Sequence, residues 1–420
     1  TRRTSSAASD VYKRQCKYSF EITSSNYNTD YSTIYAIGSS FSRVSNSSNI
    51  RLLVMESSNP SEVMGTGVYH RVDINGSGVI EMFSITADSI IVSPGKTLQL
   101  DGTVMVNDYL EMNGTCSLLS NLTGTGTLSS STGNIVVNHT NIEEVTATGG
   151  ASFVANDSYD LGGNSGWTIN STTAKDYYWV GDGGSWEDGS HWALTSGGAG
   201  SGCVPTFQDD VYFDANSFSA TGQTVSISDG VAYSRNMDWT GVTNTPIFDV
   251  DHDLSIYGSL TFSPDVTVSS INNADLNFKS TDSGNTITFA GNEWLGNIYF
   301  EGLNGEWTLQ DSLSLNNAFR DILVDEGTLN TNGNSISTGT FKVRNSATAN
   351  MSSSNIYCKY LVKIESSNYN TDNSTIYAIG SIFKEVENNS NIRLLVMEQS
   401  NPSDISVSYT HLTLPTKFVV

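Results

Sequence analysis

Apolar side chains alternate with polar ones along most of the chain, and short polar turns interrupt the alternation. The clearest stretch is 96–130, where apolar pairs recur every six residues: Leu98/Leu100, Val104/Val106, Leu110/Met112 and Cys116/Leu118. Residues two apart in a strand point to the same face, so each pair predicts a short strand with its apolar side inward. The polar dipeptides that separate the pairs predict turns: Asp101-Gly102, Asn107-Asp108 and Asn113-Gly114.

The six-residue rhythm distinguishes between β architectures. In a sandwich or barrel, turn signals are about 8–12 residues apart, which is longer than the interval seen here. Short faces of this length suit a β-solenoid, in which each coil stacks on the one before it. Further short strands are predicted around 210–213, 259–262, 286–289, 297–301, 307–309 and 327–333. No amphipathic helix longer than two turns is predicted, so we expect an all-β fold of β-solenoid (β-helix-like) segments.

One long segment of the chain occurs twice. The match begins at Cys16 and at Cys358, an offset of 342 residues, with about 35 of 48 aligned positions identical. A period of this length is a multi-element unit rather than one coil. Substitutions between the copies, such as Ser19 for Leu361, indicate diverged tandem repeats. A local duplication made during sequence assembly is the alternative.

The two ends carry a pattern of another kind. Residues 5–15 and 407–416 can each be back-translated into DNA. Codons exist for which one DNA segment is the reverse complement of the other over most of its length. Unrelated protein termini do not share such a relation, and both ends resemble translated sequencing adaptor. We therefore expect residues 1–15 and 407–420 to be non-native and to carry no information about the fold.

The expected domain organisation follows from the repeat and from the polar run Asn170-Ser-Thr-Thr-Ala-Lys-Asp176. Residues 16–169 are predicted to be the C-terminal part of one solenoid repeat unit, and 170–176 a linker. Residues 177–406 are predicted to be the N-terminal part of the next unit. Neighbouring repeat units of the same chain are thus the first expected partners.

The net charge of the chain excludes two classes of binding partner. Lys and Arg number 20 against 43 Asp and Glu, a net charge of −23. Nucleic-acid binding needs a basic face that displaces counterions, so this class is excluded, as is docking on anionic lipid. Ser, Thr, Asn and Gly make up about 43% of the residues, which suits many short strands joined by turns. No apolar run approaches the roughly 18 residues of a membrane helix, so no membrane insertion is expected in this fragment.

Ordered motifs around the linker resemble a known group of proteins. They are Tyr-Tyr-Trp-Val-Gly at 177–181, Ser-His-Trp at 190–192, Asp-Asp-Val-Tyr-Phe-Asp-Ala-Asn-Ser-Phe at 209–218 and a closing Gly-Gly-Asn-Ser-Gly-Trp at 162–167. Together they resemble large repetitive, adhesin-like secreted proteins of Bacteroidetes-type bacteria, which have predicted β-helical regions. The resemblance covers most of 150–345. It implies secretion and display at the cell surface, and a second cysteine near Ser234 that this chain lacks.

The four cysteines are Cys16, Cys116, Cys203 and Cys358. The first and last occupy equivalent repeat positions, so a full unit carries three, an odd number that cannot pair within one unit. No Cys-x-x-Cys motif or Cys/His cluster supports a zinc site. We expect small buried side chains stacked in the solenoid, with Cys116 in an inward position. A disulfide in an oxidising compartment is the alternative.

Three carboxylates offer the clearest candidate metal site, and Asp209-Asp210 and Asp325-Glu326 are weaker candidates. Asp249, Asp251 and Asp253 alternate, so a strand over this segment places all three on one face. Parallel carboxylates repel one another unless solvated or bound to a cation, and calcium is the reasonable cation. A solvated face is the other interpretation, and no metal ligand is assigned.

Aromatic residues offer the only candidate binding surface. Trp179, Trp186 and Trp192 lie within fourteen residues. They suit a compact cap over the open end of a solenoid, which needs covering. Alternatively, exposed indole rings stack on sugars. The nearby His191 is expected to have a packing or turn role.

These observations predict a fragment of a large extracellular repetitive surface protein with a structural or adhesive role. The alternative is a carbohydrate-binding module that uses the aromatic residues, which makes surface glycans a candidate partner. A β-helix polysaccharide-active enzyme is the third hypothesis. No Ser-His-Asp arrangement follows from the spacing, and we assign no catalytic or cofactor-binding residue and expect no enzyme.

Overall fold

The chain is nearly all β in a computed structural model, with 50% of residues in strands and 1% in helices, and it forms a β-solenoid of about 16 turns. This confirms the predicted fold class. The structure describes residues 13–16, 19–22, 29–37, 42–46, 49–228, 230–315, 319–378, 382–385, 394–397 and 405–407. Much of the two predicted non-native ends, 1–12 and 408–420, lies outside the described residues. Within the described ranges no helix is long and apolar enough to cross a membrane.

The chain divides into two compact units, Thr1–Thr173 and Ala174–Val420. Each unit has its own core of buried aliphatic and aromatic side chains. The division falls within the segment 170–176. Residues 13–15, part of the predicted non-native N-terminus, belong to the first strand and pair with 33–35.

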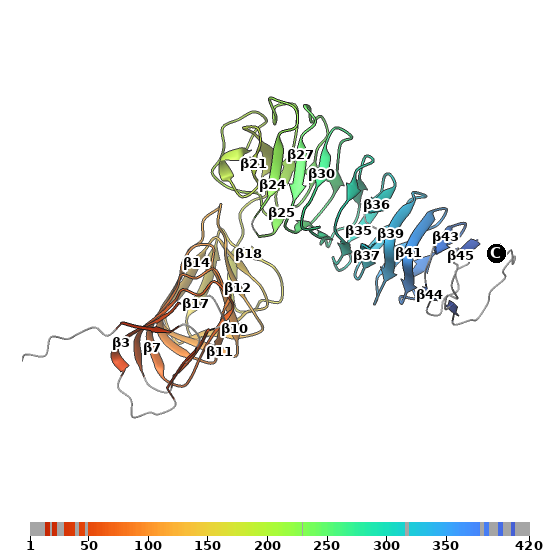
Figure 1. The fold of residues 1–420 in the computed structure, drawn as a ribbon. Helices are drawn as coiled ribbons and strands as arrows, with labels where there is room; N and C mark the ends of the chain where they lie inside the picture. The colour runs from red at the N-terminus through yellow and green to blue at the C-terminus, as the bar shows by residue number, and fades with distance from the viewer. Residues whose placement is uncertain are drawn as a thin grey trace, which may run out of the picture. The chain divides into compact units, whose positions relative to one another are not determined.

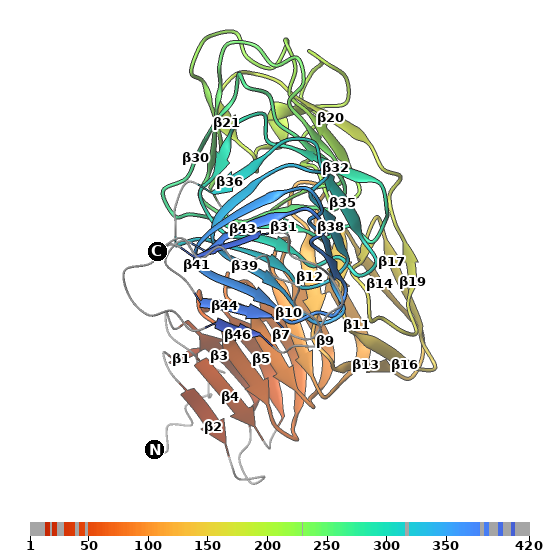
Figure 2. The same ribbon diagram turned by 90° about the vertical axis from the view of Figure 1, so that its right-hand side faces the viewer.

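The first unit stacks its strands into parallel sheets (Figures 1 and 2). One sheet contains β1 (Lys13–Cys16), β3 (Thr29–Ala36), β5 (Ile50–Met55), β7 (Val68–Ile74), β9 (Thr86–Val92), β11 (Thr103–Met112), β13 (Thr127–Ser130) and β16 (Thr146–Gly149). A second contains β2 (Ser19–Ile22), β4 (Ser42–Asn46), β6 (Ser61–Met64), β8 (Ile80–Phe83), β10 (Thr97–Asp101), β12 (Ser120–Thr123), β15 (Thr140–Ile142) and β18 (Tyr159–Asp160). A third contains β14 (Asn134–Asn138), β17 (Ser152–Asn156) and β19 (Thr168–Asn170).

The second unit repeats this plan with three sheets of its own. One contains β22 (Trp192–Ala193), β20 (Asp176–Trp179), β23 (Asp210–Tyr212), β26 (Met237–Asp238), β29 (Leu260–Thr261), β32 (Asn285–Thr288), β35 (Glu306–Leu309), β38 (Thr328–Asn330), β40 (Thr348–Asn350) and β42 (Tyr369–Asn370). A smaller sheet contains β21 (Gly184–Ser185), β24 (Thr224–Ile227), β27 (Ile247–Val250) and β30 (Thr267–Ser269). The third contains β25 (Ala232–Ser234), β28 (Leu254–Ile256), β31 (Leu276–Phe278), β33 (Glu293–Trp294), β34 (Ile298–Phe300), β36 (Leu313–Leu315), β37 (Asp321–Val324), β39 (Ile336–Val343), β41 (Asn355–Ile364), β43 (Thr375–Ala378), β44 (Ile382–Glu385), β45 (Leu394–Met397) and β46 (Ile405–Val407).

The six-residue rhythm arises because three short faces make one coil. Tyr69 pairs with Ala87, 18 residues later in the next coil. The predicted inward pairs at 98/100, 104/106 and 110/112 are all buried, which confirms three of the four. Coils of the second unit are longer: Leu254 pairs with Leu276, 22 residues on.

The fourth predicted pair, Cys116 and Leu118, is wrong. Thr115 and Leu118 exchange two backbone hydrogen bonds of 3.0 Å, so the chain turns back on itself there. Cys116 therefore lies in a turn and is half-buried, and Leu118 is 52% exposed. A local turn has replaced the strand that the apolar spacing predicted.

The two sequence copies adopt the same backbone register. In the first unit Cys16 pairs with Ala36, which pairs with Met55. In the second, the equivalent Cys358 pairs with Ala378, and that with Met397. The next strand differs: Ser19 pairs with Arg43, whereas its counterpart Leu361 pairs with Ile382, a shift of three residues. Related sequences thus form the same stacked coil in both units, with a local difference in one face.

Candidate functional site

The tryptophan cluster closes the N-terminal end of the second unit's sheet. Strand β22 is the edge strand and runs antiparallel to β20, whereas the other neighbouring strands of that sheet run parallel. Trp192 contacts Trp179 and Trp186 with ring centroids 5.0 and 4.6 Å apart in edge-to-face geometry. Phe213 connects this cluster to the next coil by stacking on Trp239 at 3.6 Å. The cluster is therefore continuous with the core of the solenoid.

The burial of these rings decides between the cap and the sugar platform. Trp179, Trp186 and Trp192 are between 0 and 3% exposed. The indole N–H groups of Trp179 and Trp192 donate to backbone carbonyls at 2.6 and 2.8 Å. With no ring face open to solvent they cannot stack on a glycan, so the carbohydrate alternative is wrong for these three residues.

His191 belongs to the same cap. Its imidazole stacks on the indole of Trp179 at 4.8 Å, with an angle of 8° between the rings. Its Nδ1 lies 2.8 Å from the carbonyl oxygen of Val180. The predicted packing role is confirmed.

The three aspartates predicted on one strand face are not arranged in that way. Strand β27 ends at Val250, so Asp251 and Asp253 lie in the turn that follows. Each carboxylate instead contacts the next coil, and the donors to Asp249, Asp251 and Asp253 are the Ser269 hydroxyl (2.5 Å) and the backbone N–H groups of Ile271 (2.7 Å) and Asp275 (2.9 Å). No group of three or more acidic, histidine or cysteine side chains that could hold a metal ion occurs among the described residues.

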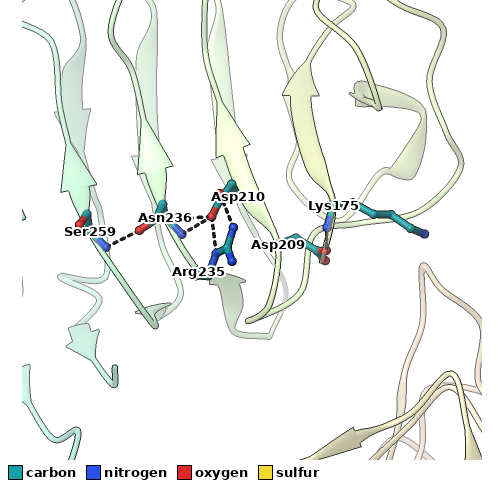
Figure 3. Close-up of polar contacts among 6 residues, drawn as sticks. All are labelled: Lys175, Asp209, Asp210, Arg235, Asn236 and Ser259. Atoms are coloured by element: carbon teal, nitrogen blue, oxygen red, sulfur yellow. Dashed lines mark hydrogen bonds and ion pairs between the residues drawn. The ribbon is translucent and has the colours of Figure 1, made fainter. Parts of the chain in front are cut away.

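A polar network at the start of the second unit joins charged and amide side chains (Figure 3). Asp210, at the start of β23, accepts hydrogen bonds from Nε and Nη2 of Arg235 and from both nitrogens of Asn236. The Asn236 Oδ1 in turn accepts the backbone N–H of Ser259, 2.7 Å away. Desolvation and the nearby carboxylate of Asp210 raise the pKa of Tyr212 to about 12.

Asp209 connects the same network to the segment before β20. Its Oδ1 accepts the backbone N–H of Lys175 at 2.9 Å, as Figure 3 shows. Its Oδ2 accepts both the N–H and the hydroxyl of Thr206. Asp209 and Asp210 are buried, and their oxygens are occupied by these donors. We interpret the carboxylate–arginine pair as structural.

The pattern continues from coil to coil as a polar ladder. The backbone N–H of Asp275 donates to Asp253, that of Asn297 to Asp275 and that of Asp321 to Asn297, over 2.9–3.0 Å. Burial raises the pKa of Asp275. Each carboxylate or amide thereby satisfies a backbone donor where the next strand begins, a group that is costly to bury unpaired.

The sequence contains a signal for this ladder that none of the motifs named above includes. An Asp or Asn directly precedes the first apolar residue of a strand once per coil, at Asp253, Asp275, Asn297 and Asp321. The interval of 22–24 residues reflects the coil length rather than a known motif. Such a period becomes visible only when the coil length is known.

Neutralising Asp210 tests the network. We expect Asp210→Asn to lower the free energy of unfolding by about 1–3 kcal/mol, because charge-assisted bonds to a buried acceptor are lost. The matched control is Glu301→Gln, which breaks the ion pair of an exposed carboxylate with Lys279 and should cost less than about 1 kcal/mol. Urea unfolding measures both, and equal losses would contradict a special role for Asp210.

The cysteines differ from one another. Cys358 is fully buried in the core, and burial raises the pKa of its thiol, as predicted for a small apolar side chain. Cys203 is half-buried and packs against the core of the second unit. Cys116 lies in the turn already described, and the side chain of Cys16 lies outside the described residues. The prediction of a small buried side chain is thus confirmed for Cys358. Cys116 and Cys203 are disulfide-bonded, which is the alternative that the sequence left open.

The described polar side chains mostly hold coils together or close turns. No protein-family model, curated protein or solved structure matches the chain. Function therefore has to be inferred from the fold and from the contacts on its surface.

Proposed function

We propose that the chain is part of a repetitive structural protein displayed outside the cell, in which solenoid units follow one another in tandem. The observation that carries this proposal is the shared register of the two sequence copies, Cys16–Ala36–Met55 and Cys358–Ala378–Met397. Copies that form the same coil can lengthen an array without changing its geometry. Stacked repeats contact only their neighbours, which makes such arrays stiff and extensible.

Two further observations support a structural role. The aromatic cap closes the N-terminal end of the second unit, as a unit that begins anew within an array requires. The carboxylates of Asp209, Asp253 and Asp275 are engaged by backbone N–H groups rather than in an open site. Weak contacts repeated along an array add through effective concentration, so an adhesive role needs no single tight site. Secretion and surface display rest on the sequence resemblance.

Display can be tested on cells that encode the protein. Antibodies against the purified chain should label intact cells, and external protease should remove the label. An antibody against a cytoplasmic enzyme serves as the control and should label lysed cells only. Labelling of this chain that also requires lysis would contradict surface display.

A further inference from the structure

Two stacked pairs of aromatic rings lie on the outside of the second unit near β41. Phe319 stacks on Tyr360 with ring centroids 5.1 Å apart and an angle of 21°. Tyr357 stacks on Tyr377 at 4.5 Å and 10°. Lys359 lies between Tyr357 and Tyr360 in the chain. We call Phe319, Tyr357, Lys359, Tyr360 and Tyr377 the aromatic patch.

The backbone explains how Phe319 and Tyr360 meet. Strand β41 shifts register against β39 where Thr338 pairs with Cys358 and Thr340 with Leu361. Gly339 is the residue of β39 inside this shift, and its N–H bonds to the carbonyl of Arg320. Since the intervening coil has a glycine there, no side chain separates the two rings.

The patch is accessible. Phe319 is 71% exposed, Lys359 is exposed, and the three tyrosines are half-buried. A single exposed apolar residue is common on protein surfaces, whereas adjoining exposed groups mark an interaction site. Phe319, Tyr360 and Lys359 adjoin one another in this way. Most of the Phe319 side chain is accessible to a ligand.

Lys359 gives the patch its charge. Its Nζ lies 5.8 Å from the Phe319 centroid and 5.7 Å from that of Tyr360, within cation–π range. Three other basic side chains of these coils are paired: Lys342, Arg344 and Lys363 pair with Asp321, Asp325 and Glu365. Lys359 forms no ion pair with any residue that the structure describes. In an acidic chain, this leaves one ammonium group available beside the exposed side chain of Phe319.

We propose that the aromatic patch binds a carboxylate-bearing polysaccharide. The apolar C–H face of a sugar ring packs on Phe319 and Tyr360, whose ring faces carry partial negative charge. The sugar carboxylate pairs with Lys359, as a charge-assisted hydrogen bond. At physiological ionic strength the rest of the chain's negative charge is screened beyond about 8 Å, so this local contact prevails.

A carboxylate-bearing polysaccharide would be the partner in the adhesive role, and this biological role rests on the proposed function. Binding is measured on the isolated chain and display on cells, so the two proposals fail separately. The triplet Cys358-Lys359-Tyr360 recurs as Cys16-Lys17-Tyr18 in the other sequence copy. A tandem array would present the same Lys–Tyr pair in each unit, which favours avidity.

The test is affinity electrophoresis of the full chain in gels that contain polygalacturonate or alginate, with fully methyl-esterified pectin as the neutral probe. We expect retardation by the two acidic polymers only. Phe319→Ala should weaken binding at least tenfold and Lys359→Gln about as much. Ile271→Ala, which removes an 80% exposed apolar side chain from the corresponding turn two coils earlier, is the matched control and should have no effect. Lys279→Gln, which breaks the pair with Glu301, is the charge control.

Circular dichroism confirms that each variant is folded, and Phe319 and Lys359 are exposed enough that folding should survive. Retardation that Phe319→Ala leaves unchanged would overturn the proposal, as would equal retardation by the neutral polymer. A wild-type chain that migrates freely through both acidic polymers would also overturn it, whatever the outcome of cell labelling.

Discussion

Replacing Trp192 by alanine is expected to lower the free energy of unfolding of the second unit by about 3–5 kcal/mol. The indole is fully buried, contacts the rings of Trp179, Trp186 and Phe213, and donates a hydrogen bond to the carbonyl of Trp186. The truncation leaves a large cavity and an unpaired buried carbonyl at the end where the stack begins. Six of the seven tryptophans lie in the second unit, so tryptophan fluorescence during urea unfolding reports mainly on it.

Phe319→Ala is the control for that experiment, because it removes an aromatic ring that is mostly exposed. It should change stability by less than about 0.5 kcal/mol. If Trp192→Ala were as stable as this control, the aromatic cluster would not be a cap. A folded Trp192→Ala protein with impaired glycan binding would restore the carbohydrate-platform interpretation.

A methyl group at Gly302 is expected to destabilise the second unit by about 3 kcal/mol or more. A Cβ at this position would lie 1.8 Å from the carbonyl oxygen of Ser280 in the preceding coil. The obstacle is backbone, so relief requires separating two coils and loosening their parallel ladder. Gly302 does not have a positive φ, and the loss therefore reports coil contact rather than backbone strain.

Gly291→Ala separates the two effects. Gly291 has a φ of +82° but open space around its Cβ position. Alanine at this position should lower the free energy of unfolding by about 1–2 kcal/mol, because only the left-handed backbone conformation is penalised. Equal losses at Gly302 and Gly291, measured by the same urea unfolding, would contradict the close coil-to-coil approach.

Local patterns predicted the fold well. The pairs Leu98/Leu100, Val104/Val106 and Leu110/Met112 are inward because two-residue alternation and turn dipeptides act within a few residues. The prediction failed at Cys116/Leu118, where a two-residue turn between Thr115 and Leu118 forms instead. Alternation alone does not show where a local turn competes with a strand.

The surface contacts were less predictable because their partners come from different coils. Asp249, Asp251 and Asp253 alternate as a strand does, but β27 ends first and each carboxylate contacts the next coil. The coil-to-coil hydrogen bonds of Asp275 and Asn297 span 22–24 residues, an interval set by the solenoid itself. Phe319 and Tyr360 meet only because Gly339 lies in the coil between them, which no spacing rule reveals.

The central claim is that the chain consists of parts of tandem solenoid units, and long-read sequencing of the source DNA tests it most directly. We predict that the sequences encoding 1–15 and 407–420 are absent from the native locus. In their place, the flanks should continue in frame with further units of about 342 residues, the offset between the two copies seen here. A locus that contains a single unit would contradict the array. The duplicated segment would then be an assembly product, and the protein a single domain whose function lies in its own surface.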